Sequence, residues 1–127
     1  MQKSLGIFRV AAVFVLAVLF GAGASLGAID IPEKLKDIPL YQGSKVQHAM
    51  DMGNSAMLTV KVDAKSDAVA DYYKSIMKAK GWNVAFQAEQ ENAKMIHFQK
   101  DKQILQVTIH TEKDGNSTIY NLVISTQ

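Results

Sequence analysis

The sequence predicts an α+β domain: a single antiparallel sheet of five to six strands with one helix packed on one face, in the order ββαββββ. Three observations support this fold class. Six short segments alternate apolar and polar residues, as half-buried strands do. One segment, residues 66–80, carries apolar residues at helical spacing. The connections are short, and short connections join neighbouring antiparallel strands.

The first residues predict export from the cytoplasm. Lys3 and Arg9 lead into the apolar run Val10 to Phe20, and small residues follow it. A positive start, an apolar centre and a small-residue end are typical of a signal peptide. Ala22-Gly23-Ala24 resembles a cleavage site, so we expect a signal peptide over residues 1–24.

Two alternatives to that cleavage site stay open. The signal peptide could end at Ala28 instead, although Leu26 then occupies the −3 position. An uncleaved anchor is the other reading, because residues 10–29 reach the roughly 20 residues that a spanning helix needs. In every case we expect a periplasmic or secreted domain, with membrane contact only through the N-terminal segment if it is kept.

Charge and cysteine content narrow the function. Removing Lys3 and Arg9 lowers the number of Lys and Arg from 14 to 12, which equals the 12 Asp and Glu. The processed domain is then neutral and has no arginine, the residue most used to recognise phosphate and guanine. We therefore expect no nucleic-acid partner. The chain has no cysteine, which excludes disulfides, thiol catalysis and thiolate metal sites.

Residues 25–44 form a predicted lead-in segment, and residues 45–127 form the predicted α+β domain. Ile31-Pro32 and Ile38-Pro39 interrupt regular structure in the lead-in, because proline fixes φ and biases the residue before it to extended backbone. Residues 33–37 between them have room for one helical turn.

The domain begins with a predicted hairpin and a helix. Residues 45–52 and 56–62 read as strands that flank a turn at Gly53-Asn54-Ser55. In residues 66–80, Ser66 is the expected N-cap and Gly81 the expected left-handed residue after the C-terminus. One apolar stripe faces the core; its members are Val69, Tyr72, Tyr73, Ile76 and Met77.

Four more strands complete the prediction, over residues 82–88, 94–99, 104–111 and 118–125. In the first of them we expect Trp82, Val84, Phe86 and Ala88 to share one face. Asp114-Gly115 is a hairpin turn signal between the last two. Asn116-Ser117-Thr118 fits the N-glycosylation pattern, yet asparagine and serine are also ordinary turn residues.

Several of these segments resemble a set of small exported bacterial proteins of unknown function. The resemblance rests on Pro39-Leu40-Tyr41-Gln42-Gly43-Ser44, on Tyr72-Tyr73-Lys74 and on Lys80-Gly81-Trp82. Those proteins have a Tyr-Pro-Gly start, a helix that bears Tyr-Tyr-Lys and ends at Gly-Trp, and a strand meander after it. Gln42 departs from their proline. The resemblance covers residues 37–126 and implies an exported α+β domain with no known catalytic residues.

One string has the composition of a metal site. His48, Met50 and Met52 alternate on a strand, with Met57 across the turn. Imidazole and thioethers are soft ligands that suit Cu(I) or Ag(I). If Gly53-Asn54 is a two-residue turn, Met50 opposes Met57, His48 opposes Thr59, and all four candidate ligands share one face.

A three-residue loop at 53–55 gives the opposite reading. Met50 then opposes Leu58, His48 opposes Val60, and these side chains face the core. We favour this register, because it buries Val46 rather than placing it opposite Lys61, and an apolar side chain of this size gains about 1.5–3 kcal/mol on burial.

Other candidate residues carry less chemistry. If Phe98 opposes Leu105, then His97 and His110 point outward and lie about 13 Å apart along the ladder, too far to share an ion. Asp67 and Asp71 lie on an exposed helix face, which does not raise a carboxylate pKa as acid catalysis requires.

These observations predict a non-enzymatic domain without a cofactor that binds a protein, an envelope component or a small apolar partner. The sheet face opposite the helix is the expected surface; we place Gln47, Ala49, Gln106, Thr108 and His110 on it. A soft-metal carrier that uses His48, Met50 and Met52, with Met57 in reserve, is the alternative. A hydrolase or transferase is a third hypothesis, for which spacing names no nucleophile and base.

Overall fold

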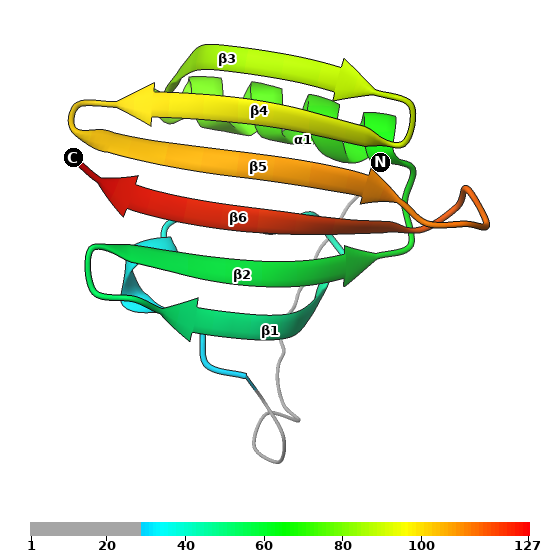
Figure 1. The fold of residues 1–127 in the computed structure, drawn as a ribbon, viewed down its shortest axis with the longest axis horizontal. Coiled ribbons are helices and arrows are strands. Elements are labelled where there is room, and N and C mark those ends of the chain that lie inside the picture. The colour runs from blue at the N-terminus through cyan, green and yellow to red at the C-terminus, as the bar shows by residue number, and fades with distance from the viewer. Residues whose placement is uncertain (1–28) are drawn as a thin grey trace, which may run out of the picture.

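A computed structural model describes residues 29–127 of the chain. It confirms the predicted fold class: one antiparallel six-stranded sheet with a single helix packed against it (Figure 1). In chain order the elements are η2 (Glu33–Leu35), β1 (Lys45–Asp51), β2 (Ser55–Val62), α1 (Ser66–Ala79), β3 (Asn83–Gln90), β4 (Ala93–Lys100), β5 (Gln103–Thr111) and β6 (Thr118–Thr126). The predicted signal peptide and its cleavage sites lie outside the described residues.

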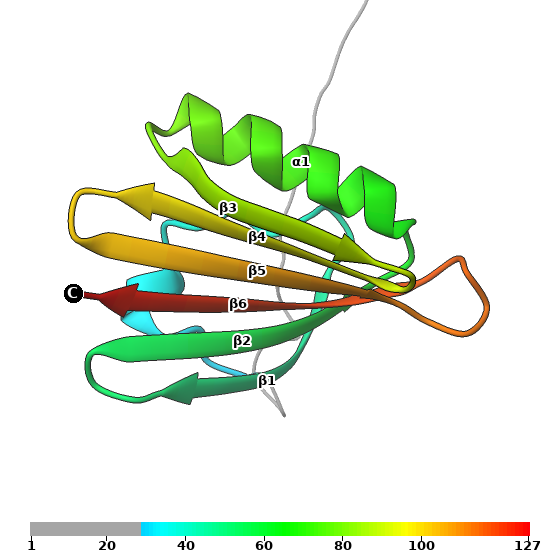
Figure 2. The ribbon, with the colours of Figure 1, turned by 45° about the horizontal axis from the view of Figure 1, so that its top comes forward.

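The strands lie in the order β1-β2-β6-β5-β4-β3, so the last strand lies between the first hairpin and the three strands β5, β4 and β3. Helix α1 covers the β3–β5 half of one face, and the lead-in with η2 runs behind β2 and β6 on the same side (Figures 1 and 2). We call this side the covered face and the opposite side the open face.

Alternate residues of the inner strands build the core on the covered face. In β2, β5 and β6 the buried and half-buried positions alternate along most of each strand, as the sequence predicts. The helix contributes Val69, Tyr73 and Met77, and the lead-in contributes Leu35 and Ile38. Part of the cover over the core is therefore an irregular segment that precedes the first strand.

The favoured register of the first hairpin is wrong. Met52 N–H donates to the Ser55 carbonyl (2.8 Å), which closes a two-residue turn at Gly53-Asn54, with Gly53 at φ +82°. Met50 consequently opposes Met57. The expected conflict between Val46 and Lys61 does not arise, because a bulge at Gln47 lets Val46 oppose Val60 on the covered face.

A second bulge corrects the prediction for the strand after the helix. Val84 opposes Phe98 on the covered face, whereas Phe86 opposes His97 on the open face. Ala85 is the extra residue between them, so Val84 and Phe86 do not share a face as strict alternation would require. Both bulges lie in the border strands of the sheet, β1 and β3.

The prediction for the N-terminal end of α1 is wrong, and the prediction for its C-terminal end is confirmed. The N-cap residue is Lys65, and Ser66 makes no capping bond; its Oγ accepts a hydrogen bond from Thr111 Oγ1 (2.9 Å) instead. The C-terminal prediction is confirmed: Gly81 has φ +91° and its N–H donates to the Lys78 carbonyl (3.0 Å). The Trp82 N–H donates to the Met77 carbonyl (2.9 Å), and this second bond completes a Schellman motif.

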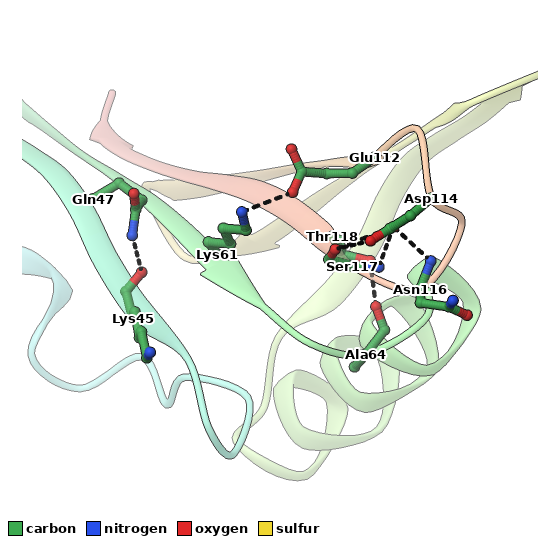
Figure 3. A network of polar contacts seen from close by, with 9 residues as sticks. All are labelled: Lys45, Gln47, Lys61, Ala64, Glu112, Asp114, Asn116, Ser117 and Thr118. Carbon is green, nitrogen blue, oxygen red and sulfur yellow. Dashed lines mark hydrogen bonds and ion pairs between the residues drawn. The ribbon is translucent and has the colours of Figure 1, made fainter.

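The predicted turn at Asp114-Gly115 is organised by one carboxylate (Figure 3). Asp114 Oδ1 accepts hydrogen bonds from the backbone N–H groups of Asn116 (2.9 Å) and Ser117 (3.1 Å). The Asn116 N–H is the main cause that holds the pKa of this carboxyl below its usual range. Thr118 Oγ1 donates to the Ala64 carbonyl (2.6 Å) and ties the turn to the start of the helix. Asn116 and Ser117 thus have a structural role in the turn.

Tyrosine side chains hold the lead-in against the core. Tyr73 Oη donates to the Pro39 carbonyl (2.8 Å), and Tyr72 Oη donates to Leu40 (3.2 Å). Tyr120 Oη lies 2.7 Å from Ser44 Oγ and accepts from the Tyr41 N–H (3.2 Å). The lead-in is therefore part of the folded unit.

Candidate functional site

The open face carries a row of side chains that crosses all six strands. Directly opposed residues define it, and we call it the transverse row; its members are Met50, Met57, Val123, Gln106, His97 and Phe86. Met50 is 43% exposed and Phe86 is 51% exposed, at the two borders of the sheet. Four of the six side chains are apolar, on a face that neither the helix nor the lead-in covers.

His97 is the polar centre of the β3–β4 half of this row. Its ring lies 5.3 Å from the Phe86 ring, centroid to centroid, at an interplanar angle of 55°. Its Nε2 is the one buried side-chain nitrogen or oxygen within residues 29–127 that has no hydrogen-bond partner. A buried polar atom without a partner costs free energy, so His97 is placed in the sheet at some cost to stability.

A polar row runs beside the transverse row. His48, Thr59, Asn121 and Thr108 oppose one another in sequence across β1, β2, β6 and β5. Thr59 Oγ1 donates to Asn121 Oδ1 (2.7 Å) between the neighbouring strands β2 and β6. The open face therefore presents an apolar stripe bordered by hydrogen-bonding groups, which is the usual make-up of a protein-binding surface.

The structure brings three of the four predicted soft ligands to this face. Met50 and Met57 are directly opposed, and His48 lies two residues before Met50 on the same side. Met52 follows β1 at the turn and is 47% exposed. The expectation that these side chains form the core is wrong, because the two-residue turn directs them away from it. Within residues 29–127, His, Cys, Asp and Glu side chains form no group of three able to hold a metal ion.

The remaining surface predictions have mixed outcomes. Phe98 opposes Leu105 and Ala93 opposes His110, so the predicted register of β4 and β5 is confirmed. Gln106, Thr108 and His110 lie on the open face, as expected. Ala49 does not: it opposes Leu58 and packs against the core. Gln47 is the bulge residue and is exposed.

A polar groove of about 420 Å³ separates α1 from β3 and β4. Lys94 Nζ bridges Asp67 Oδ1 (2.9 Å) and Glu89 Oε2 (2.8 Å) within it. The Lys94 hydrogen bond lowers the pKa of Asp67, and the two carboxylates raise the pKa of Lys94. Asp67 stays ionised, which is the opposite of what a general acid needs. Within the groove, Lys94 is held between these two carboxylates.

Comparisons with known proteins give one match. A family model described as START domain-like matches residues 44–116, which is more than half of the chain. No curated protein and no solved structure matches the chain. The family match is compatible with a small binding domain that is not an enzyme. Among residues 29–127, no helix has the length and apolar character needed to cross a membrane.

Proposed function

The chain belongs to the START domain-like family, and on that premise we propose that it is an exported, non-enzymatic domain that binds a protein or another envelope component through the open face of its sheet. The observation that carries the proposal is the transverse row. It places Met50 and Phe86, both largely exposed, in line with Met57 and Val123 on an uncovered face. Gln106 and His97 lie between Val123 and Phe86, and exposed apolar side chains accompanied by polar ones are typical of interaction sites.

Two further features support a macromolecular partner. The row spans the width of six strands, which at about 4.8 Å per strand is roughly 24 Å, the scale of a protein interface rather than of an enclosed small molecule. The polar row beside it adds hydrogen-bonding side chains, among them His48, which is exposed. Apolar contact then supplies affinity, and the flanking polar row supplies orientation.

A photo-cross-linking experiment tests this face against a matched position. A benzophenone amino acid replaces Phe86, Met57 or Val84 in turn, and the protein is irradiated in the cells that produce it. Val84 is the control, because it is 46% exposed in the same strand but points to the other face. We expect positions 86 and 57 to cross-link one common partner that position 84 does not reach. Equal cross-linking from 84 and 86, or none from either, rejects the proposal, as does measurable turnover on hydrolase substrates.

The hairpin register favours a second candidate, a Cu(I) or Ag(I) site. Opposed residues on antiparallel strands have Cβ atoms about 4.5–5.5 Å apart, so the Met50 and Met57 thioethers can reach one ion. The His48 imidazole is the adjacent ligand on β1, and Met52 is a fourth at the turn. Such a ligand set is soft and matches monovalent copper or silver.

A Cu(I) competition titration tests this candidate. The Met50→Leu/Met57→Leu variant removes both thioethers at nearly constant side-chain volume. Met95→Leu is the control, because Met95 lies on the open face but in β4, away from the hairpin. We expect the double variant to lose most of the affinity and the control to keep it. Wild-type protein that does not compete for Cu(I), or a double variant that competes equally well, contradicts the metal site.

A further inference from the structure

A second cavity, of about 400 Å³, opens at the end of the molecule where three segments meet. η2, the C-terminal end of α1 and the β4–β5 turn all lie at this end (Figure 2). Lys34 lines the cavity from η2, Lys80 from the helix end, and Lys100 from the end of β4. We call it the lysine pocket. It is separate from the open face and from the groove beside Lys94.

The floor of the lysine pocket is apolar. Ile38, Trp82 and Ile124 line it, and these side chains are 5%, 6% and 2% exposed. They belong to the core, and three lysines stand around their outer edges. A concave apolar surface with a few converging polar groups is the usual form of a small-molecule site.

The rim carries a positive charge that the lining does not neutralise. Asp37 is the one carboxylate among the lining residues, against three lysines. Lys34 lies 3.9 Å from Asp51 Oδ1, at the limit of an ion pair, and that carboxylate is more than half exposed. Like charges around a concavity raise its potential and attract anions. The groove beside Lys94 differs, because Lys94 is paired with two carboxylates there.

The position of Lys100 is fixed by the helix end. Its Nζ donates to the Lys80 carbonyl (2.9 Å), one of the carbonyls left free where α1 stops. A side chain on Gly81 would touch Lys100 Cε at 3.6 Å, which shows how closely the lysine lies over that turn. The ammonium thus offsets the negative end of the helix dipole and leaves the rim suited to an anion.

We propose that the lysine pocket binds a small organic monocarboxylate. Its carboxylate accepts hydrogen bonds from the Lys34, Lys80 and Lys100 ammonium groups, and its apolar body rests on Trp82, Ile38 and Ile124. Three lysines against Asp37 leave the lining with a net positive charge, which the ligand carboxylate partly offsets. This site is independent of the partner surface proposed above.

Trp82 is the only tryptophan of the chain, so its fluorescence reports on this pocket alone. The purified protein is titrated with hexanoate and, as an uncharged match, with 1-hexanol. We expect a saturable change in Trp82 emission with hexanoate, weaker binding of hexanol, and loss of hexanoate affinity at high salt, because the rim charges are partly exposed. The shift of the Trp82 indole N–H resonance is a second readout that does not depend on quenching.

Two double variants locate the binding. Lys34→Gln/Lys80→Gln removes two rim charges, and Lys36→Gln/Lys78→Gln removes two charges from the same segments outside the pocket. Exposed charge pairs contribute about 0.2–1 kcal/mol each, so we expect the pocket variant to bind about five- to tenfold more weakly and the control to stay close to wild type. Absence of a response in both readouts, equal binding of hexanol, or equal loss in the two variants overturns the proposal.

Discussion

The substitution Tyr73→Phe tests how strongly the lead-in is tied to the core. Tyr73 is fully buried, and its hydroxyl donates to the Pro39 carbonyl 34 positions earlier in the chain (2.8 Å). Phenylalanine keeps the ring that packs 5.0 Å from Tyr72 and 5.5 Å from Tyr120, centroid to centroid. The substitution therefore removes the hydrogen bond and leaves the aromatic packing in place.

The expected cost follows from the two groups of that bond. A net hydrogen bond contributes about 1 kcal/mol, and a half-buried carbonyl left without its donor costs a further 1–3 kcal/mol at most. We expect the free energy of unfolding to fall by about 2 kcal/mol, a large part of the 5–15 kcal/mol typical of a domain. For a domain of this size that corresponds to a Tm lower by about 8–16 °C.

Urea denaturation of wild type, Tyr73→Phe and Tyr72→Phe measures this cost. Tyr72→Phe is the matched control, because its bond to Leu40 is longer (3.2 Å) and its side chain is half-buried. We expect the control to lose less than about 1 kcal/mol. A Tyr73→Phe variant within about 0.5 kcal/mol of wild type, or a control that loses as much, would refute the reasoning.

The contribution of Tyr73 to the free energy of unfolding should depend on pH. Burial is the main cause that raises the pKa of the Tyr73 hydroxyl far above its usual range. The unfolded chain ionises this group near pH 10, whereas the folded protein does not. The contribution of Tyr73 to stability is therefore complete below pH 10 and declines as the pH rises above it. The difference between wild type and Tyr73→Phe should narrow in alkaline urea titrations; a constant difference contradicts this account.

Three further predictions concern other parts of the chain. Gly81→Ala should lower the free energy of unfolding by about 1 kcal/mol, because a φ of +91° is unfavourable for alanine although its methyl group would meet no clash. An unchanged midpoint of urea denaturation contradicts this. Asp114→Asn should destabilise the protein near pH 6 and progressively less as the pH falls through the lowered pKa of Asp114, since that carboxylate contributes only when ionised; a pH-independent difference would argue against its role in the turn. Mass spectrometry of the exported protein should find a chain that begins after Ala24, and a retained Met1 would favour the anchor.

The sequence predicts the inner strands better than the border strands. In β2, β5 and β6 one face is buried by the core, and a shift of one residue would expose every apolar side chain, so alternation predicts their orientation well. β1 and β3 have a neighbour on one side only. Each can hold an extra residue, Gln47 or Ala85, without disturbing a second ladder. Alternation counted straight through a bulge assigns every later side chain to the wrong face.

The candidate site was predicted only in part for the same reason. The sequence identifies the four soft residues of the first hairpin, but they share a face only if the turn has two residues, and the energy of burying Val46 argues against that turn. A bulge removes that conflict and is not visible in the residue pattern. The sequence does not predict the transverse row or the lysine pocket, because each gathers residues from segments far apart in the chain, which only the fold brings together.

The bulges in β1 and β3 also decide how this protein can associate. The outermost strand of a sheet exposes backbone N–H and C=O groups to which another chain can add, and such addition leads to fibrils. Gln47 and Ala85 interrupt both available ladders near their beginnings, so a straight incoming strand loses its register after a few bonds. Growth by strand addition is opposed at both borders. A partner is therefore more easily bound by the open face of the sheet than by its border strands. We expect the protein to resist polymerisation even at high concentration.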